Sequence, residues 1–132
     1  MPLKKTVIQP KSLNDPRPRY SQGLAVTKPS RLLFIAGQTA SDKDGKVVGK
    51  GDIEAQAHQV FKNIAAVLKE AGGSFDNLMM TTTYITDIKY REGYNRVRTQ
   101  YYKKTPPTST LVVIKGLARE EYLLEIAGIA VL

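Results

Sequence analysis

The chain has 132 residues, 42% of them hydrophobic, which is enough apolar material for the packed core of a single domain over residues 1–132. It has no cysteine, which excludes a disulfide framework, a thiolate zinc site and a cysteine nucleophile. The net charge of +8 is concentrated at the amino-terminal end, because the first 40 residues carry seven of the 20 basic side chains and one of the 12 acidic ones.

The first thirty residues are interrupted by prolines, which limits regular structure there to two short strands, at Lys5–Gln9 and Ser21–Thr27. An apolar run at Arg31–Ala36 then predicts a buried strand. The turn-forming residues Asp42–Gly45 and the short apolar segment Lys46–Gly49 predict a hairpin-like return with one more strand.

A long helix is predicted after Asp52, because apolar side chains recur there every three or four residues. Asp52 is expected to cap its start, and Gly72 and Gly73 to permit the left-handed turn that ends it. A β-rich run at Met79–Thr86 and a second helix from about Ile88 to Tyr102 follow.

Two last strands, Thr108–Lys115 and Tyr122–Val131, are connected by a polar loop and are predicted to form an antiparallel pair. The order of elements predicts an α+β fold, in which two helices pack on one face of a mixed sheet. The final strand is too continuously apolar to have one face in water, so we expect a second covering surface, such as a subunit interface.

Three polar residues are candidates for function. Glu125 lies in the middle of the apolar last strand, where a carboxylate is costly unless it is paired, reaches a pocket or points to solvent. Asn95, on the second helix, either caps a neighbouring backbone group or lines a cleft. His58 is the only histidine and has no acidic or nucleophilic partner nearby in sequence, which favours a structural or surface role.

In their order and spacing, several segments resemble the Rid family of reactive intermediate deaminases, which is YjgF-like and also known as the L-PSP endoribonuclease family. The matching segments are Arg19–Gly23, Phe34–Gln38, Gln56 with Asn63 and Leu68, Tyr94–Val97, Pro106–Pro107 and Leu124–Ala127. The resemblance implies a chorismate-mutase-like fold and a homotrimer with pockets between adjacent subunits. It also implies hydrolysis of imines or enamines such as 2-aminoacrylate, to a keto acid and ammonia, without a metal or an organic cofactor.

The resemblance also assigns residues to the pocket. The glutamate that positions the hydrolytic water matches Glu125, which is the expected catalytic residue. The substrate-binding positions that keep the family pattern are Tyr20, Gly37, Gln38 and Asn95. Three other positions depart from the family pattern. Ser109 is at the position of the carboxylate-binding arginine, Ala36 is at the position of a serine, and Leu111 is at a position often occupied by cysteine.

These departures affect the expected substrate, because no hydroxyl replaces the charge of a guanidinium that binds a carboxylate. The leading hypothesis is therefore an imine or enamine hydrolase, or a small-metabolite-binding trimer, whose ligand lacks the usual carboxylate anchor. The sequence leaves open whether Arg19 or Arg98 replaces the missing arginine.

Two other functions stay open. The basic amino-terminal segment would suit RNA binding, and some family members are described as endoribonucleases, although a single histidine makes cleavage hard to explain. A purely structural or chaperone-like trimer is the third hypothesis. No apolar run approaches the roughly 20 residues of a membrane-spanning helix, and Met1–Lys5 leads into no apolar signal segment, so we expect a cytoplasmic protein without membrane association.

Overall fold

The computed structural model describes residues 3–132, so Met1 and Pro2, which begin the segment considered above for a signal peptide, lie outside the described residues. Its strands are β1 (Lys4–Ile8), β2 (Gly23–Thr27), β3 (Leu32–Gln38), β4 (Leu78–Ile85), β5 (Thr108–Val113) and β6 (Leu124–Val131). Its helices are α1 (Ile53–Glu70) and α2 (Arg91–Tyr101), with 3-10 turns η1 (Phe75–Asn77) and η2 (Ile88–Tyr90) before β4 and α2.

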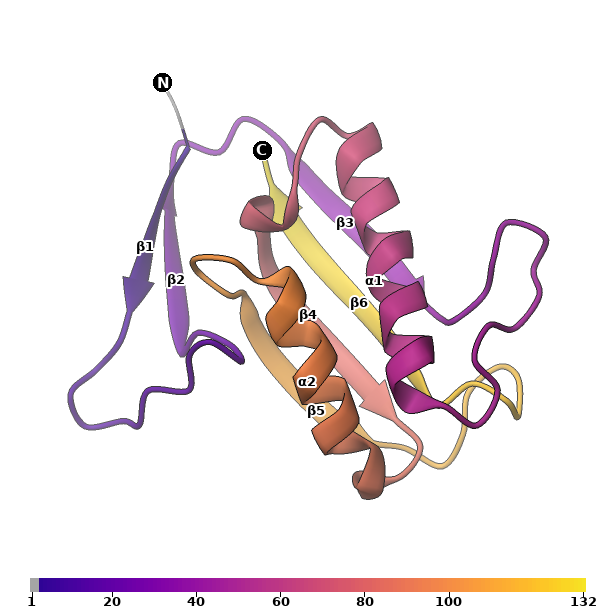
Figure 1. Ribbon diagram of the computed structural model, residues 1–132. Coiled ribbons are helices and arrows are strands. Elements are labelled where there is room, and N and C mark those ends of the chain that lie inside the picture. Colours follow the sequence, from indigo (N-terminus) through magenta and orange to yellow (C-terminus); the bar gives the residue numbers. More distant parts are fainter. Residues whose placement is uncertain (1–2) are drawn as a thin grey trace.

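The main sheet has four strands in the order β3-β6-β4-β5. Strands β4 and β5 run parallel, whereas β6 is antiparallel to both β3 and β4. Both helices cover the same face of this sheet (Figure 1), which confirms the predicted α+β fold with two helices on one face of a mixed sheet. Strands β1 and β2 form a separate antiparallel hairpin beside it.

The predicted antiparallel pairing of the last two strands is wrong. Strand β5 pairs with β4 in parallel, and β6 lies on the other side of β4. The reason is the helix between them, because α2 returns the chain to its starting end and β5 therefore runs in the same direction as β4. The loop after β5 then carries the chain past β4 to the centre of the sheet.

The predicted strand at Lys46–Gly49 is also absent, and only one isolated bridge, between Ser41 and Val47, forms there. Gly45 and Gly49 have φ angles of +76° and +75°, which no extended strand adopts. The segment is therefore a loop between β3 and α1.

Both ends of α1 are as the sequence predicts. The Asp52 side chain accepts a hydrogen bond of 3.1 Å from the amide of Ala55 at the start. At the end, Gly72 has a φ of +86°, and the amide of Gly73 donates to the carbonyl of Leu68 at 2.8 Å, which is a Schellman arrangement. The apolar face of α1 is buried against the sheet.

Two of the family-like residues on α1 hold loops in place. Buried Gln56 donates to the carbonyl of Glu121 at 2.8 Å and accepts from the amide of Leu123 at 2.9 Å, just before β6. Asn63 donates to the carbonyl of Thr39 at 3.1 Å, just after β3. These bonds set the positions of the two strand ends that carry Glu125 and Gly37.

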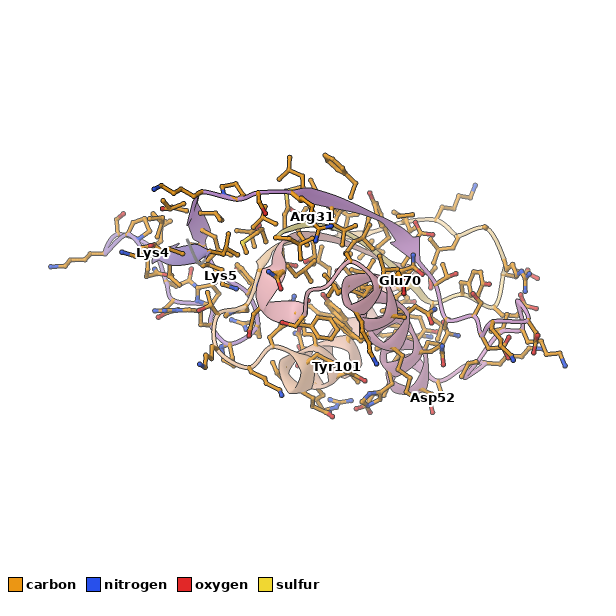
Figure 2. The ribbon with its side chains drawn as sticks, turned by 90° about the horizontal axis from the view of Figure 1, so that it is seen from above. Lys4, Lys5, Arg31, Asp52, Glu70 and Tyr101 are labelled. Atoms are coloured by element: carbon orange, nitrogen blue, oxygen red, sulfur yellow. The ribbon has the colours of Figure 1, made fainter. Side chains whose placement is uncertain are left out.

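The face of the sheet opposite the helices is uncovered in the single chain, as the view from above shows (Figure 2). Phe34 is 71% exposed on this open face, and Met80 is 46% exposed. Both are in register with Ile129 of β6, so they form one apolar row across three strands. Along β6, Leu124 and Ile126 point the other way and are fully buried under the helices. No helix in residues 3–132 is long and apolar enough to cross a membrane.

Candidate functional site

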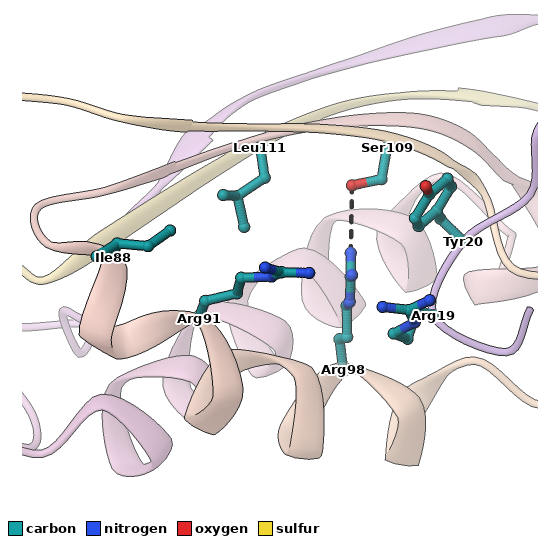
Figure 3. Close-up of a pocket in the computed structure, with 7 residues that line it drawn as sticks. All are labelled: Arg19, Tyr20, Ile88, Arg91, Arg98, Ser109 and Leu111. Carbon is teal, nitrogen blue, oxygen red and sulfur yellow. Dashed lines mark hydrogen bonds between the residues drawn. The ribbon is translucent and has the colours of Figure 1, made fainter. Parts of the chain in front are cut away.

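A cavity of about 270 Å³ lies between α2, β5 and the loop that precedes β2. Its lining residues come from these three segments and from η2 (Figure 3): Arg19, Tyr20, Ile88, Arg91, Arg98, Ser109 and Leu111. Three of the seven are arginines and none is acidic. The cavity therefore presents a concentrated positive charge.

Arg98 is the buried arginine of this set, with only 4% of its surface exposed. Its Nη1 atom donates hydrogen bonds to the Oγ of Ser109 at 3.3 Å and to the hydroxyl of Tyr94 at 3.2 Å. The guanidinium also lies 4.6 Å from the centre of the Tyr94 ring, a cation–π contact. Its Nε atom is buried without a hydrogen-bond partner.

The three cavity arginines pair with no carboxylate in the described part of the chain, where the ion pairs are Arg17–Asp15 and Arg96–Glu54. A buried guanidinium without a counter-ion is costly, because its neighbours replace the lost hydration only in part. An anion in the cavity would offset that cost and take up donor groups that the protein leaves free.

A buried polar network holds Arg98 in place. The hydroxyl of Tyr94 lies 2.9 Å from the Oγ1 of Thr83 on β4, and both side chains are fully buried. The network thus connects the central strand β4 through α2 to Ser109 on β5. A side chain anchored in this way presents its charge in one direction, which favours selective binding.

The loop that carries Arg19 and Tyr20 is fastened to the start of β5 by Ser21. Its amide donates to the carbonyl of Pro107 at 2.9 Å, and its hydroxyl donates to the carbonyl of Pro106 at 2.5 Å. Ser21 is 1% exposed, so these bonds are shielded from water. They bring the Tyr20 ring to 5.8 Å from the Arg98 guanidinium.

A second cluster surrounds Glu125 on the open face of the sheet. The carboxylate of Glu125 lies against Gly37, since a β-carbon added to Gly37 would be 2.5 Å from its Oε2 atom. Gly37 belongs to a bulge in β3, between Ile35 and Gln38, where the register with β6 shifts. Gln38 donates across the bulge to the carbonyl of Ala36 at 3.1 Å.

The expected site residues therefore fall into two groups. Tyr20, Ser109 and Leu111 line the arginine cavity, whereas Ala36, Gly37, Gln38 and Glu125 form the second cluster. Side chains alternate along a strand, and the register shows that the groups lie on opposite faces. Ser109 is opposite buried Thr81 on the helix side, and Glu125 is opposite Tyr84 on the open side. One chain does not bring them together.

Asn95 belongs to neither group. It is half-buried on α2, and its Oδ1 atom is buried without a hydrogen-bond partner. Arg91 and Ile88 were not among the site residues expected from the sequence, which left the role of Arg98 open. Arg91, Tyr94 and Arg98 are spaced three and four residues apart, so they lie along one side of α2, with Arg91 exposed at its start and Tyr94 and Arg98 buried.

His58 lies outside the cavity, on α1. Its Nδ1 atom is 2.8 Å from the hydroxyl of Tyr101, whose pKa is raised by burial. Within residues 3–132, no group of three or more His, Asp or Glu side chains is placed to hold a metal ion.

The chain is similar to known proteins along nearly its whole length. Residues 11–132 match the family described as Endoribonuclease L-PSP. A RutC family protein of Saccharolobus solfataricus is 39% identical over 112 residues, which are 84% of this chain and 85% of that protein. A RutC family protein of Pyrococcus abyssi is 31% identical over 97% of this chain and 98% of its own length.

Solved structures show the same relationship. The conserved Rid family protein YyfB of Yersinia pestis superposes with a TM-score of 0.90 at 28% identity, covering 97% of this chain and 98% of that chain. RidA from an Antarctic Psychrobacter bacterium superposes with a TM-score of 0.72 at 26% identity, covering 96% and 99%.

Proposed function

Because the chain belongs to the Rid family, also described as the L-PSP endoribonuclease family, we propose that it is an imine or enamine deaminase whose substrate carboxylate is bound by Arg98. The observation that carries this proposal is the hydrogen bond from Arg98 to Ser109. Ser109 stands where typical members have the carboxylate-binding arginine, so a guanidinium from α2 reaches the place that the strand arginine has left. A substrate that carries a carboxylate is therefore compatible with the proposed function.

The proposed reaction is the addition of water to a carbon–nitrogen double bond. An enamine first tautomerises to the imine, with Arg98 holding the carboxylate. Glu125 accepts a proton from the attacking water, whose oxygen bonds to the imine carbon, and the nitrogen takes up a proton. Protonated Glu125 supplies the proton that the nitrogen takes up. When the carbon–nitrogen bond of this carbinolamine breaks, the hydroxyl proton moves to the nitrogen, so ammonia leaves and the carbon keeps its oxygen as the keto group.

The two groups of site residues would meet between chains. We propose a homotrimer in which the Glu125 cluster of one subunit faces the arginine cavity of its neighbour. The open sheet face supports this assembly, since Phe34 and Met80 expose large apolar surfaces around the β6 strand that carries Glu125. Light scattering tests it: we expect a trimer, and expect Phe34→Asp to give monomers. A parent protein that is monomeric at micromolar concentration would remove the shared site.

The activity is tested by measuring ammonia release from 2-aminoacrylate generated in the assay by a pyridoxal-phosphate lyase. The protein should accelerate release over the spontaneous rate, and Arg98→Gln should remove most of the acceleration. Arg96→Gln is the matched control, because Arg96 lies on the same helix, exposed and paired with Glu54. No acceleration by the parent protein, or equal acceleration by Arg98→Gln, would overturn the proposal.

RNA binding is the second candidate. The basic amino-terminal segment and the unpaired cavity arginines favour contact with phosphates. Strand cleavage is less well supported, because the only histidine lies outside the cavity. Affinity for single-stranded RNA would have to fall steeply as salt is added, whereas a small ligand held at Arg98 would respond much less.

A further inference from the structure

We infer that the ligand of the arginine cavity carries two acidic groups on a short carbon chain, one bound at Arg98 and the other at one of the two arginines that flank it, Arg91 or Arg19. This inference rests on the proposed function, because it names the substrate class of the same site. It goes beyond a substrate with a single carboxylate, which needs one guanidinium.

The first argument is the number of charges. A single carboxylate bound to Arg98 would leave two further arginines in a cavity that one chain lines with no acidic residue, and Glu125 of a neighbouring subunit would neutralise only one of them. Cations gathered without counter-ions repel one another, and a second acidic group removes that repulsion. The positive charge of the three arginines therefore exceeds the negative charge that a monocarboxylate supplies.

The second argument is their arrangement. Arg91 is the first residue of α2, and Arg98 lies seven residues further along the same helix, so their Cα atoms are about 10 Å apart. The Arg91 guanidinium extends toward Arg98 from one side, and Arg19 lies on the other side (Figure 3). Both flanking side chains are more exposed than Arg98, which suits the outer end of an elongated ligand.

The third argument is size and lining. A cavity of about 270 Å³ is smaller than the 300–1,000 Å³ typical of sites for drug-sized ligands. Ile88 and Leu111 supply its apolar wall, which suits the carbon chain between two acidic groups. These dimensions favour a small dianion over a nucleotide.

Calorimetric titration of the full-length protein with three probes tests the inference. 2-Oxoglutarate and 2-oxopentanoate have the same five-carbon chain and differ in the second carboxylate, whereas phosphoenolpyruvate carries a phosphate as its second acidic group on a three-carbon chain. We expect 2-oxoglutarate, phosphoenolpyruvate or both to bind about tenfold to a hundredfold more tightly than 2-oxopentanoate. A dianion that binds more tightly than 2-oxopentanoate shows that the second subsite accepts its second acidic group, carboxylate or phosphate.

Variants then locate the second subsite. Arg91→Gln or Arg19→Gln should weaken the binding of the dianions more than that of 2-oxopentanoate, and the variant with the larger effect identifies the second subsite. Arg96→Gln should alter neither, since Arg96 is outside the cavity. The inference is overturned if the parent protein binds all three probes equally, or if Arg91→Gln and Arg19→Gln weaken 2-oxopentanoate as much as the dianions.

The outcome for the inference is separate from the outcome for the proposed function, because binding requires no turnover. A preference for dianions without imine hydrolysis would overturn the deaminase and leave the dianion site standing. The opposite result is also possible. If the two keto acids bind equally, and their imines are hydrolysed at equal rates at limiting concentration, the dianion site is overturned and the deaminase still stands.

Discussion

The Nη1 atom of Arg98, on α2, lies 3.3 Å from the Oγ of Ser109, on β5. Helix and strand therefore meet at the position where typical Rid proteins carry an arginine on the strand. An arginine that comes from α2 enters the cavity from the helix side and points toward the sheet. A carboxylate bound by it would approach from a different direction, so the rest of the substrate would also lie differently in the cavity.

The first prediction concerns affinity. Arg98→Gln should weaken the binding of 2-oxobutanoate by about tenfold to a hundredfold, because a charge-assisted contact is lost. Arg98→Lys should recover only part of that loss, since an ammonium keeps the charge but not the two parallel donors. Calorimetry measures both. Equal affinities in the parent and in Arg98→Gln would mean that carboxylates bind elsewhere.

The second prediction concerns stability without ligand. Arg98→Met should raise the free energy of unfolding by about 1–3 kcal/mol, because methionine fills similar space without a buried charge that lacks a partner. Urea unfolding measures the difference. Added 2-oxoglutarate should stabilise the parent protein and not Arg98→Met. A variant that is less stable than the ligand-free parent would show that the bonds to Tyr94 and Ser109 outweigh the cost of burial.

The third prediction tests whether the charge has moved from strand to helix. Arg98→Ser should lose affinity for 2-oxobutanoate, and adding Ser109→Arg should restore at least part of it, because the two positions share one place in the cavity. Ser109→Arg in the presence of Arg98 should instead destabilise the fold, since it brings two guanidinium groups together. No recovery in a well-folded double variant would contradict the exchange of roles.

The fourth prediction is a pH dependence. Burial raises the pKa of Tyr102 well above its ordinary value, whereas the unfolded chain exposes it with a pKa of about 10. Its contribution to stability is complete below pH 10 and falls above it by about 1.4 kcal/mol per pH unit, because only the unfolded state releases the proton. Between pH 10 and 11.5, the free energy of unfolding measured in urea should fall less steeply with pH for Tyr102→Phe than for the parent protein. Identical slopes would show that Tyr102 ionises equally in both states.

The elements of the fold were predictable because their signals are local. The 3.6-residue period, Asp52 and the glycine pair define α1 without reference to the rest of the chain. The order of the strands was not predictable in this way, because pairing depends on contacts between distant segments. Nothing within β5 or β6 indicates that β4 lies between them.

The site was predictable in part for a similar reason. Tyr20, Ser109 and Leu111 were identified through their family positions, and they do line one cavity. Arg98 was harder to place, because an arginine on a helix is usually solvated and its burial depends on the Tyr94 network. The separation of Glu125 from that cavity follows from strand register, which the sequence alone does not determine.

The last prediction tests whether the site is shared between chains. Arg98→Gln and Glu125→Gln should each be inactive alone, the first without the carboxylate anchor and the second without the base that accepts a proton from water. The two side chains lie on opposite faces of the sheet in one chain, so an active site would need Arg98 from one subunit and Glu125 from the next. Unfolding the two variants together and refolding them at equal concentrations should give mixed trimers.

In such mixtures about a quarter of the interfaces combine an intact Arg98 with an intact Glu125, because each interface in a cyclic trimer pairs two different surfaces. The mixture should therefore recover about a quarter of the parent ammonia-release rate. Each variant refolded alone is the control, and light scattering must show trimers in every sample. If the mixed trimers stay as inactive as their components, then Arg98 and Glu125 do not act on the same substrate across an interface, and the proposed division of the site between two chains is wrong.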